Sequence, residues 1–189
     1  VLRTGIISEF ADDNEYLITF TTQNETMQEV VTLQDDETRN LQFDLSEIII
    51  PEGYSIGYID VSVTSEEESG ISGQCDSVAG DIIMNDLAAQ WSDPGNNLSG
   101  QDSSCIPIEL DLAIYPNFNG ESITVSAINE YQALLNWSEE GWGDGSLSID
   151  LDLDVNAPLG FDPLNTDSDE EITVDVYISL FAVSIQEIE

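Results

Sequence analysis

Oxygen-bearing side chains are concentrated in one ten-residue stretch near the C-terminal end of the chain, DPLNTDSDEE at positions 162–171. Proline, threonine and serine interrupt the acidic residues, which is a composition typical of a loop. A hard cation such as Ca²⁺ takes six to eight oxygen ligands at about 2.3 to 2.6 Å. The pattern therefore predicts a calcium-binding loop, and a solvated acidic loop is the alternative.

This stretch resembles the start of a thrombospondin type 3 calcium repeat, in which Asp-Pro-Leu-Asn-x-Asp-x-Asp continues into Gly-Asp-Gly. The resemblance covers ten residues, departs at Glu170, where the repeat has glycine, and does not continue beyond that point. It implies Ca²⁺ as the cofactor and nominates as ligands Asp162, Asn165, Asp167, Asp169 and Glu171.

A second candidate site combines aromatic and acidic residues between positions 131 and 144. Tyr131, Trp137 and Trp142 are interleaved with acids at 139, 140 and 144, and such a platform could stack a sugar ring and bind its hydroxyls. The alternative is that Trp137 packs into the core while Trp142 covers a loop.

Catalytic groups are scarce, because the chain has no histidine and no lysine. The usual serine and cysteine triads, Schiff-base chemistry and histidine-bound metals are therefore excluded. Carboxylate pairs remain, as in glycosidases and aspartic proteases, where one acid must have a raised pKa. No pepsin-like Asp-Thr-Gly motif is present. We expect no enzyme, with a carboxylate-pair hydrolase as the alternative.

The charge balance is extreme, since 39 acidic residues face only Arg3 and Arg39, for a formal net charge of −37. A Debye length of roughly 30 Å at 0.01 M salt leaves these charges repelling, whereas roughly 3 Å at 1 M screens them. The composition predicts a halophilic adaptation with a fold that requires salt or cations. Cation binding and mimicry of nucleic acid are the alternatives. Nucleic-acid binding itself is excluded, because two arginines cannot neutralise a phosphate backbone.

The only two cysteines, Cys75 and Cys105, lack the further thiols or histidines that a zinc site requires. They are expected to form a disulfide, which places the chain in an oxidising compartment, extracellular or at the cell surface. Sequons at Asn24, Asn97 and Asn136 agree with a secreted glycoprotein.

The chain begins Val-Leu-Arg without methionine or a signal region, so we expect a processed or truncated mature protein. No apolar run approaches the roughly 18 residues that span a bilayer. A membrane anchor could have preceded Val1.

Period-two alternation of apolar and polar residues dominates the elements that must position these groups. From Ser146 to Val155, for example, leucine, isoleucine and valine alternate with serine and aspartate. The same rule predicts strands at about 15–22, 28–33, 40–50, 59–64, 80–84, 108–114, 121–128, 146–155 and 172–188. The last is apolar on both faces from Tyr177 to Ile185, which predicts a central or fully covered strand.

Helix is expected only at Asp86–Trp91 and Glu130–Trp137, each capping one end of the molecule. Loops are expected at 65–80 and 92–104, with the two cysteines in or beside them. The fold class is therefore all-β: a single antiparallel β-sandwich over residues 1–189, Ig-like or jelly-roll-like, of about nine strands with one or two short helices.

The leading functional hypothesis is a non-enzymatic extracellular module: a subunit of a surface filament, matrix or cell-wall layer, or an anchored ectodomain. Its expected partners are copies of itself or other surface proteins. The apolar segment Gly5–Phe10, within residues 1–12, could be donated to a neighbour's sheet edge. This architecture resembles the donor-strand arrangement of archaeal surface filaments; the alternative is the sandwich's own first strand. The second hypothesis is a calcium-assisted carbohydrate-binding or adhesion domain with a glycan partner.

Overall fold

The computed structural model describes residues 13–66, 75–155 and 169–188. Nine strands make up most of the regular structure in these ranges: β1 (Asn14–Gln34), β2 (Thr38–Asp44), β3 (Tyr54–Glu66), β4 (Ser77–Ile82), β5 (Ser99–Asp102), β6 (Ile108–Ala113), β7 (Ile123–Ala127), β8 (Ser146–Asp154) and β9 (Asp169–Ile188). One α-helix and two 3₁₀ turns join them: α1 (Glu130–Leu134), η1 (Leu45–Glu47) and η2 (Leu135–Trp137).

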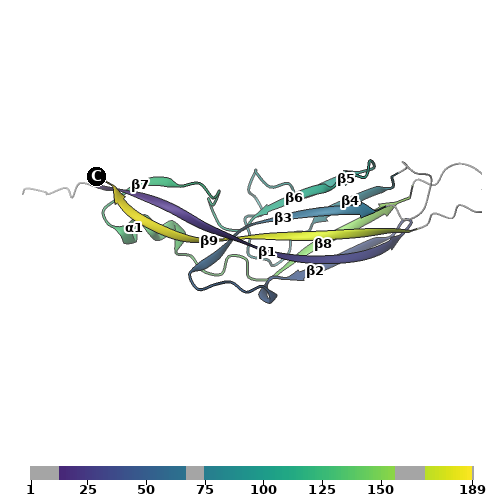
Figure 1. Ribbon diagram of the computed structural model, residues 1–189, viewed down its shortest axis with the longest axis horizontal. Coiled ribbons are helices and arrows are strands. Elements are labelled where there is room, and N and C mark those ends of the chain that lie inside the picture. Colours follow the sequence, from purple (N-terminus) through teal and green to yellow (C-terminus); the bar gives the residue numbers. More distant parts are fainter. Residues whose placement is uncertain (1–12, 67–74, 156–168, 189) are drawn as a thin grey trace, which may run out of the picture.

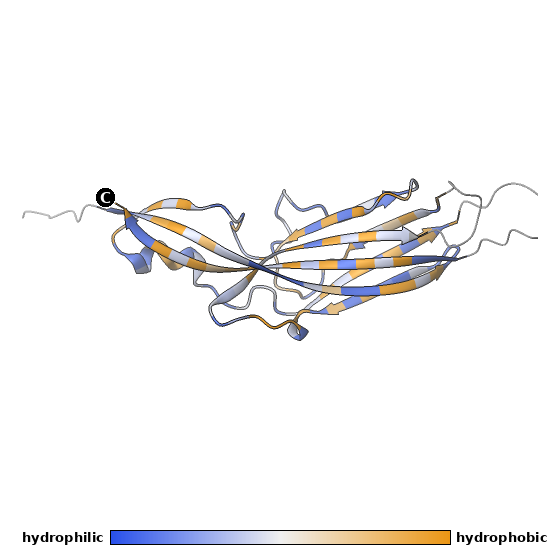
Figure 2. Cartoon of the chain, viewed as in Figure 1, coloured by the Kyte–Doolittle hydropathy of each residue, from blue (hydrophilic) through white to orange (hydrophobic). Residues whose placement is uncertain are grey.

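The strands form two antiparallel sheets, which confirms the predicted all-β sandwich (Figure 1). One sheet has the order β6-β3-β9-β1-β7 and the other the order β2-β8-β4-β5. Figure 2 shows the alternation of apolar and polar residues as bands along the arrows. The apolar residues of this alternation form the core between the two sheets. The most buried members of this core include Leu147, Ile149, Leu151 and Leu153 of β8 and Ile172, Val174, Val176, Ile178 and Leu180 of β9.

The central ladder between β1 and β9 is much longer than the sandwich. It runs without a register shift from Glu15 opposite Ile188 to Gln34 opposite Asp169. β9 lies between β3 and β1, so the predicted central position of the last strand is confirmed.

The two halves of this ladder bury opposite faces. In β9 the buried apolar residues have even numbers up to Leu180, whereas the next ones, Phe181 and the partly buried Val183 and Ile185, have odd numbers. β1 changes face in the same way, from Ile18 to Val31. The double-sided apolar pattern in β9 is therefore a change from one buried face to the other, not one fully covered strand.

The part of the ladder that extends beyond the sandwich is here called the arm. It consists of Asn14–Thr22 of β1, Phe181–Ile188 of β9, all of β7, and α1 with η2. Figure 1 shows it at the left, with α1 against one side of the three strands. Its small core comprises Tyr16, Ala127 and Ala133, with Val125 and Ile185 packed against them.

An aromatic cluster joins the arm to the sandwich. The ring of Phe181 stacks on Phe118 at 4.1 Å and meets Tyr115 edge-on at 5.1 Å, and Trp137 and Phe20 pack around them. Close approach at this point requires a glycine, because a Cβ added to Gly57, at the β-bulge in β3, would overlap the Phe118 ring.

The predicted disulfide between Cys75 and Cys105 is confirmed, with the Cα atoms 5.5 Å apart. Cys75 precedes β4, and Cys105 follows β5, which pairs with β4 through four residues only. The bond therefore ties the edge of the four-stranded sheet. In the chain-entropy model, a closed loop of this length stabilises the fold by roughly 3.5 kcal/mol.

Several predicted elements were wrong in detail. The predicted helix Asp86–Trp91 is absent, because its backbone bonds elsewhere: the Leu87 N–H donates to the Asn85 side chain and the Ala88 N–H to the Asp144 carbonyl. The predicted strands 15–22 and 28–33 are one strand, β1. The predicted strand 40–50 ends at Asp44, whose carboxylate caps η1. β5 lies inside the predicted loop 92–104.

Some expectations fall outside the described residues. These are the donated segment Gly5–Phe10 and three of the calcium ligands, Asp162, Asn165 and Asp167. Among the helices of the described ranges, none is long and apolar enough to cross a membrane.

Candidate functional site

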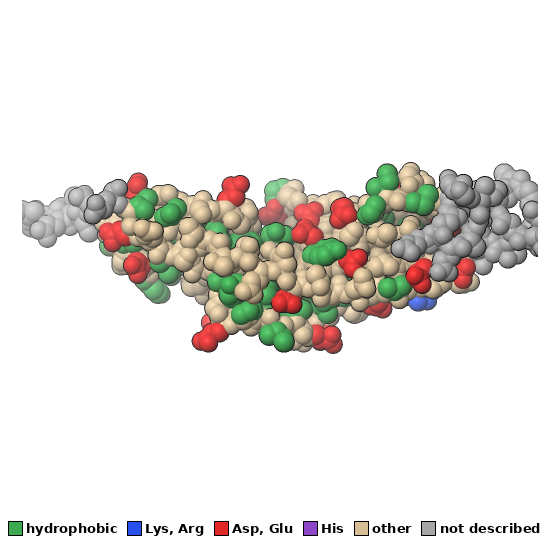
Figure 3. All heavy atoms as spheres, in the orientation of Figure 1, with side chains coloured by type: hydrophobic (Ala, Val, Ile, Leu, Met, Phe, Trp, Pro, Cys, Tyr) green, Lys and Arg blue, Asp and Glu red, His purple; other side chains and the backbone are tan. Residues whose placement is uncertain are grey.

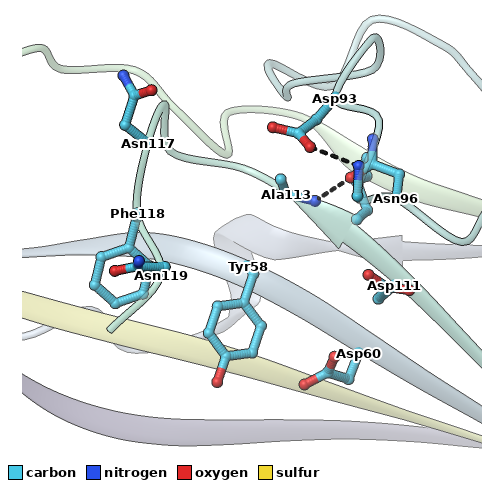
Figure 4. A pocket seen from close by; sticks show the side chains of 11 residues that line it. Tyr58, Asp60, Asp93, Asn96, Asp111, Ala113, Asn117, Phe118 and Asn119 are labelled. Atoms are coloured by element: carbon cyan, nitrogen blue, oxygen red, sulfur yellow. Dashed lines mark hydrogen bonds between the residues drawn. The ribbon is translucent and has the colours of Figure 1, made fainter. Parts of the chain in front are cut away.

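A hollow of about 440 Å³ lies on the outer face of the five-stranded sheet, over β3 and β6. Asp60 of β3 is directly opposite Asp111 of β6, and Tyr58 lies two residues before Asp60 on the same face. Figure 4 shows Tyr58 between Phe118 on one side and Asp60 on the other, with Asp93 and Asn96 above Asp111.

The loops around this hollow are held by their own polar side chains. The Gly95 N–H donates to Asp93 Oδ1 at 2.8 Å, and the Ala113 N–H donates to Asn96 Oδ1 at 2.8 Å (Figure 4). Asp111 accepts a hydrogen bond from the Asn97 N–H at 3.1 Å. These carboxylate and amide groups therefore have structural roles in addition to lining the hollow.

The carboxylate of Asp60 has a raised pKa. The largest cause is loss of hydration on partial burial, and the nearby carboxylates of Asp111 and Glu109 add to it. The hollow thus offers clustered oxygen acceptors beside the ring of Tyr58, which stacks on Phe118 with centroids 6.1 Å apart. Such a site suits a cation or a neutral polyhydroxylated ligand and disfavours an anion.

A second acidic cluster lies at the far end of the sandwich and was not predicted from the sequence. Carboxylate oxygens of Asp35, Asp36 and Asp154 all lie within 4.8 Å of one another. The turn after β1 brings them together, since the Asp36 N–H donates to the Leu153 carbonyl and Asp35 accepts from the Val155 N–H. Spacing along the sequence gives no signal for this cluster, because the turn after β1 and the end of β8 are more than 100 residues apart.

The two described members of the predicted calcium set lie at this same end. Asp169 is opposite Gln34 at the start of β9, and the Gln34 amide donates to its Oδ2 at 3.4 Å. Glu171 is opposite both Thr32 of β1 and Glu66 of β3. Whether these groups bind calcium stays a prediction.

The predicted sugar platform is divided by the fold. Trp137 stacks on Tyr115 with centroids 5.9 Å apart and meets Phe20 at 4.8 Å, so its faces are used in packing. Tyr131 lies on α1 and is 76% exposed. Trp142 lines two hollows, of about 430 and 450 Å³, and its indole N–H donates to Glu139.

The three sequons differ in their accessibility. Asn24 and Asn136 are exposed, on β1 and on η2. Asn97 is also exposed, but its amide donates to the Glu109 carbonyl at 2.6 Å. Glycosylation of all three stays a prediction.

The arm presents a surface of a different kind. Within it, only Glu15, Glu130 and Glu187 are charged, although the chain carries 39 acids. Ile128, in the link between β7 and α1, is 55% exposed, and Leu135 of η2 is 44% exposed. Figure 3 shows carboxylates scattered along the visible face, with apolar surface between them. The sequence did not reveal this surface, because its segments are far apart in the chain.

The chain matches no protein-family model. No curated protein is similar enough to it in sequence to count as a relative.

Several solved structures are distantly similar. A decameric BFDV capsid protein has a TM-score of 0.44 and 9% identity, covering 86% of this chain and 99% of that one. A protein of Mud crab tombus-like virus has a TM-score of 0.44 and 10% identity over 90% and 83%. A protein of Desmodium yellow mottle tymovirus has 0.36 and 14% over 88% and 91%. These scores are too low to carry an inference, and none of the three is an archaeal filament or thrombospondin-type protein.

Proposed function

We propose that this chain is a non-enzymatic structural module that self-associates and works outside the cytoplasm. The observation that carries the proposal is the uneven surface: an acidic sandwich is joined to an arm that has only three charged residues, exposed apolar residues and open strand edges. Exposed apolar surface and unpaired edges favour association with another chain.

Several open edges are available for assembly. β1 pairs with β7 only through Asn14–Ile18, and among the described residues no strand continues along that side of β1 as far as Gln34. An open edge accepts an added strand through main-chain hydrogen bonds. The disulfide between the segment before β4 and the segment after β5 supports an oxidising compartment, because such bonds do not persist in a reducing cytosol.

The assembly state at low and high salt tests this proposal. Electron microscopy and light scattering of the intact chain should show particles larger than a monomer at high salt, where the charges of neighbouring copies are screened. A monomer at every salt and protein concentration would contradict self-association.

The proposed location outside the cytoplasm is tested separately. Peptide mapping of protein isolated from its native source should find Cys75 joined to Cys105 and glycan at Asn24 or Asn136. Free thiols together with unmodified asparagines would contradict a location outside the cytoplasm.

A second candidate function is calcium-assisted carbohydrate binding. It is favoured by Trp142, which borders two hollows beside Glu139 and Asp144. Binding on a glycan array should disappear in Trp142→Ala and persist in Tyr177→Ala, which removes an exposed ring from the sandwich. The calcium component is tested by heating with and without a chelator at fixed ionic strength, and an unchanged Tm would contradict it.

A carboxylate-pair hydrolase is favoured only by the opposed pair Asp60 and Asp111, one of which has a raised pKa. Glycan hydrolysis that is lost in Asp60→Asn would support it and contradict the non-enzymatic proposal.

A further inference from the structure

We propose that two copies of this chain pair antiparallel through the outer edge of β7, forming a dimer joined at the arms. The inference rests on the self-association proposed above and names the surface and the partner, a second copy.

The edge itself is open. β7 pairs with β1 from Ile123 to Ala127, and no described strand lies on its other side. In an antiparallel ladder, every second residue of an edge strand directs its N–H and C=O groups away from the sheet. β7 therefore presents main-chain groups that a second strand can satisfy.

β7 is also the only one of the four described edge strands without a charged side chain. The edge strand β6 carries Glu109 and Asp111, β2 carries Arg39 and Asp44, and β5 carries Asp102. Charged side chains are a common protection against edge-to-edge pairing, and β7 has none. In a chain of net charge −37, an uncharged edge allows a second copy to approach with the least repulsion.

Apolar residues extend the surface beyond the strand. Ile128 directly follows β7, and Tyr131 and Leu135 lie on the adjoining α1 and η2, all of them exposed. Five paired residues alone would make a small interface, so burial of these side chains is needed for a stable dimer. Ile128 directly follows β7, and α1 packs against β7 through Ala133 and Ala127, so the proposed dimer has these side chains at the border of the contact.

The sequence of β7 permits self-pairing without opposed charges. When the two-fold axis passes through a residue, two identical antiparallel strands keep their corresponding side chains on the same face of the joined sheet. With the axis at Val125, Ile123 lies opposite Ala127 and Thr124 opposite Ser126 of the second copy. Glu121 then lies opposite Asn129, so no carboxylate faces another across the pair.

The direction of the arm suits the charge distribution. The arm projects from one end of the sandwich along the long axis (Figure 1). An antiparallel pair of arms therefore holds the two sandwiches at opposite ends of the dimer, where their repulsion is smallest. Dimerisation should strengthen as salt rises, because the remaining repulsion is screened.

The test adds charge at the proposed contact. Thr124 and Ser126 are exposed, so Thr124→Glu/Ser126→Glu places carboxylates opposite each other in the dimer. Ser126 is also opposite Glu15 of β1 in the same monomer, so Thr124→Glu alone, opposite Leu17, is measured beside it to separate loss of the dimer from loss of monomer stability. Sedimentation equilibrium at high salt should show dimerisation weakened by about tenfold or more, the size expected at the centre of an interface. The isosteric control Thr124→Gln/Ser126→Gln should retain most of the affinity, with Tm checked for both.

A matched variant separates this edge from the other edge of the arm. Gln186→Glu adds charge to β9, whose stretch from Val183 to Ile188 also has no described strand on its β3 side. It should leave dimerisation within about twofold of the wild type. Loss of the dimer in Gln186→Glu, with no change in Thr124→Glu/Ser126→Glu, would overturn the β7 contact but leave self-association standing. A wild type that never associates would overturn both.

Discussion

The sandwich and the arm share the strands β1 and β9 but bury opposite faces of them. In the sandwich, β1 and β9 bury one face against a second sheet. The outer face of their own sheet carries carboxylates of β9, β3 and β6. In the arm they bury the other face, where Ala133 of α1 packs with Tyr16 and Ala127 in a small core. One ladder can therefore serve two cores, because alternation lets each half bury whichever face has a partner layer.

The largest expected effect concerns the junction between the two regions. Phe181→Ala should lower the free energy of unfolding by about 3 to 5 kcal/mol, because Phe181 is 1% exposed and contacts four other rings of the cluster. Denaturant unfolding would measure this loss. Tyr177→Ala removes a ring of similar size that is 44% exposed, and it should cost much less. Equal losses in the two variants would contradict a junction core.

The disulfide should act on the sandwich alone. Cys75→Ser/Cys105→Ser should cost roughly 3.5 kcal/mol by releasing the loop that the bond closes. Hydrogen exchange should rise in β4 and β5 while the amides of β7 keep their protection. Faster exchange throughout the arm would show that the two regions unfold together.

The close contact between Gly57, at the β-bulge, and the ring of Phe118 can be tested with a pair of substitutions. Gly57→Ala should cost about 1 to 3 kcal/mol, because the new methyl group overlaps the Phe118 ring. A double variant with Phe118→Leu should recover part of this loss relative to Phe118→Leu alone, as measured by a double-mutant cycle. If the losses of stability from the two substitutions simply add, overlap with the Phe118 ring is not the cause of the loss in Gly57→Ala.

The smallest expected effect is at Asp60, whose raised pKa favours the protonated folded state. Stability from this group is therefore fully present below the ordinary pKa of 3.8 and is lost as pH rises through the higher folded pKa. Asp60→Asn should stabilise the fold at neutral pH by less than about 1 kcal/mol, since the carboxylate keeps part of its hydration.

The control for Asp60 is Glu140→Gln, which removes one exposed charge elsewhere. The gain of Asp60→Asn over this control should disappear in thermal melts at pH values below 3.8. A gain that persists in acid would mean that the carboxylate is not the cause.

The sequence predicted the layers of this fold well because alternation reports burial directly. Leu147, Ile149, Leu151 and Leu153 are all fully buried, as their spacing indicated. The arm could not be predicted, because the same spacing does not say which layer covers a face. Along β1 the buried residues change from even-numbered to odd-numbered positions, so its sequence pattern resembled two separate strands.

Clusters of side chains from distant segments are harder to predict from the sequence than strands, because the sequence does not show which strands pair. Asp60 and Asp111 are brought together by the pairing of β3 with β6, and Asp35 and Asp154 by hydrogen bonds between the turn after β1 and the end of β8. The disulfide was predictable because two cysteines allow only one pairing. Trp137 shows the opposite case, since its spacing to Trp142 suggested a shared platform and packing placed it in the aromatic cluster.

The shape of the associated protein tests the division between arm and sandwich most directly. Small-angle X-ray scattering at high salt should show a dimer markedly longer than the monomer, with two separated masses joined by a thin centre. A dimer of the same greatest dimension as the monomer would mean that the sandwiches lie side by side. That result would contradict association through the arm.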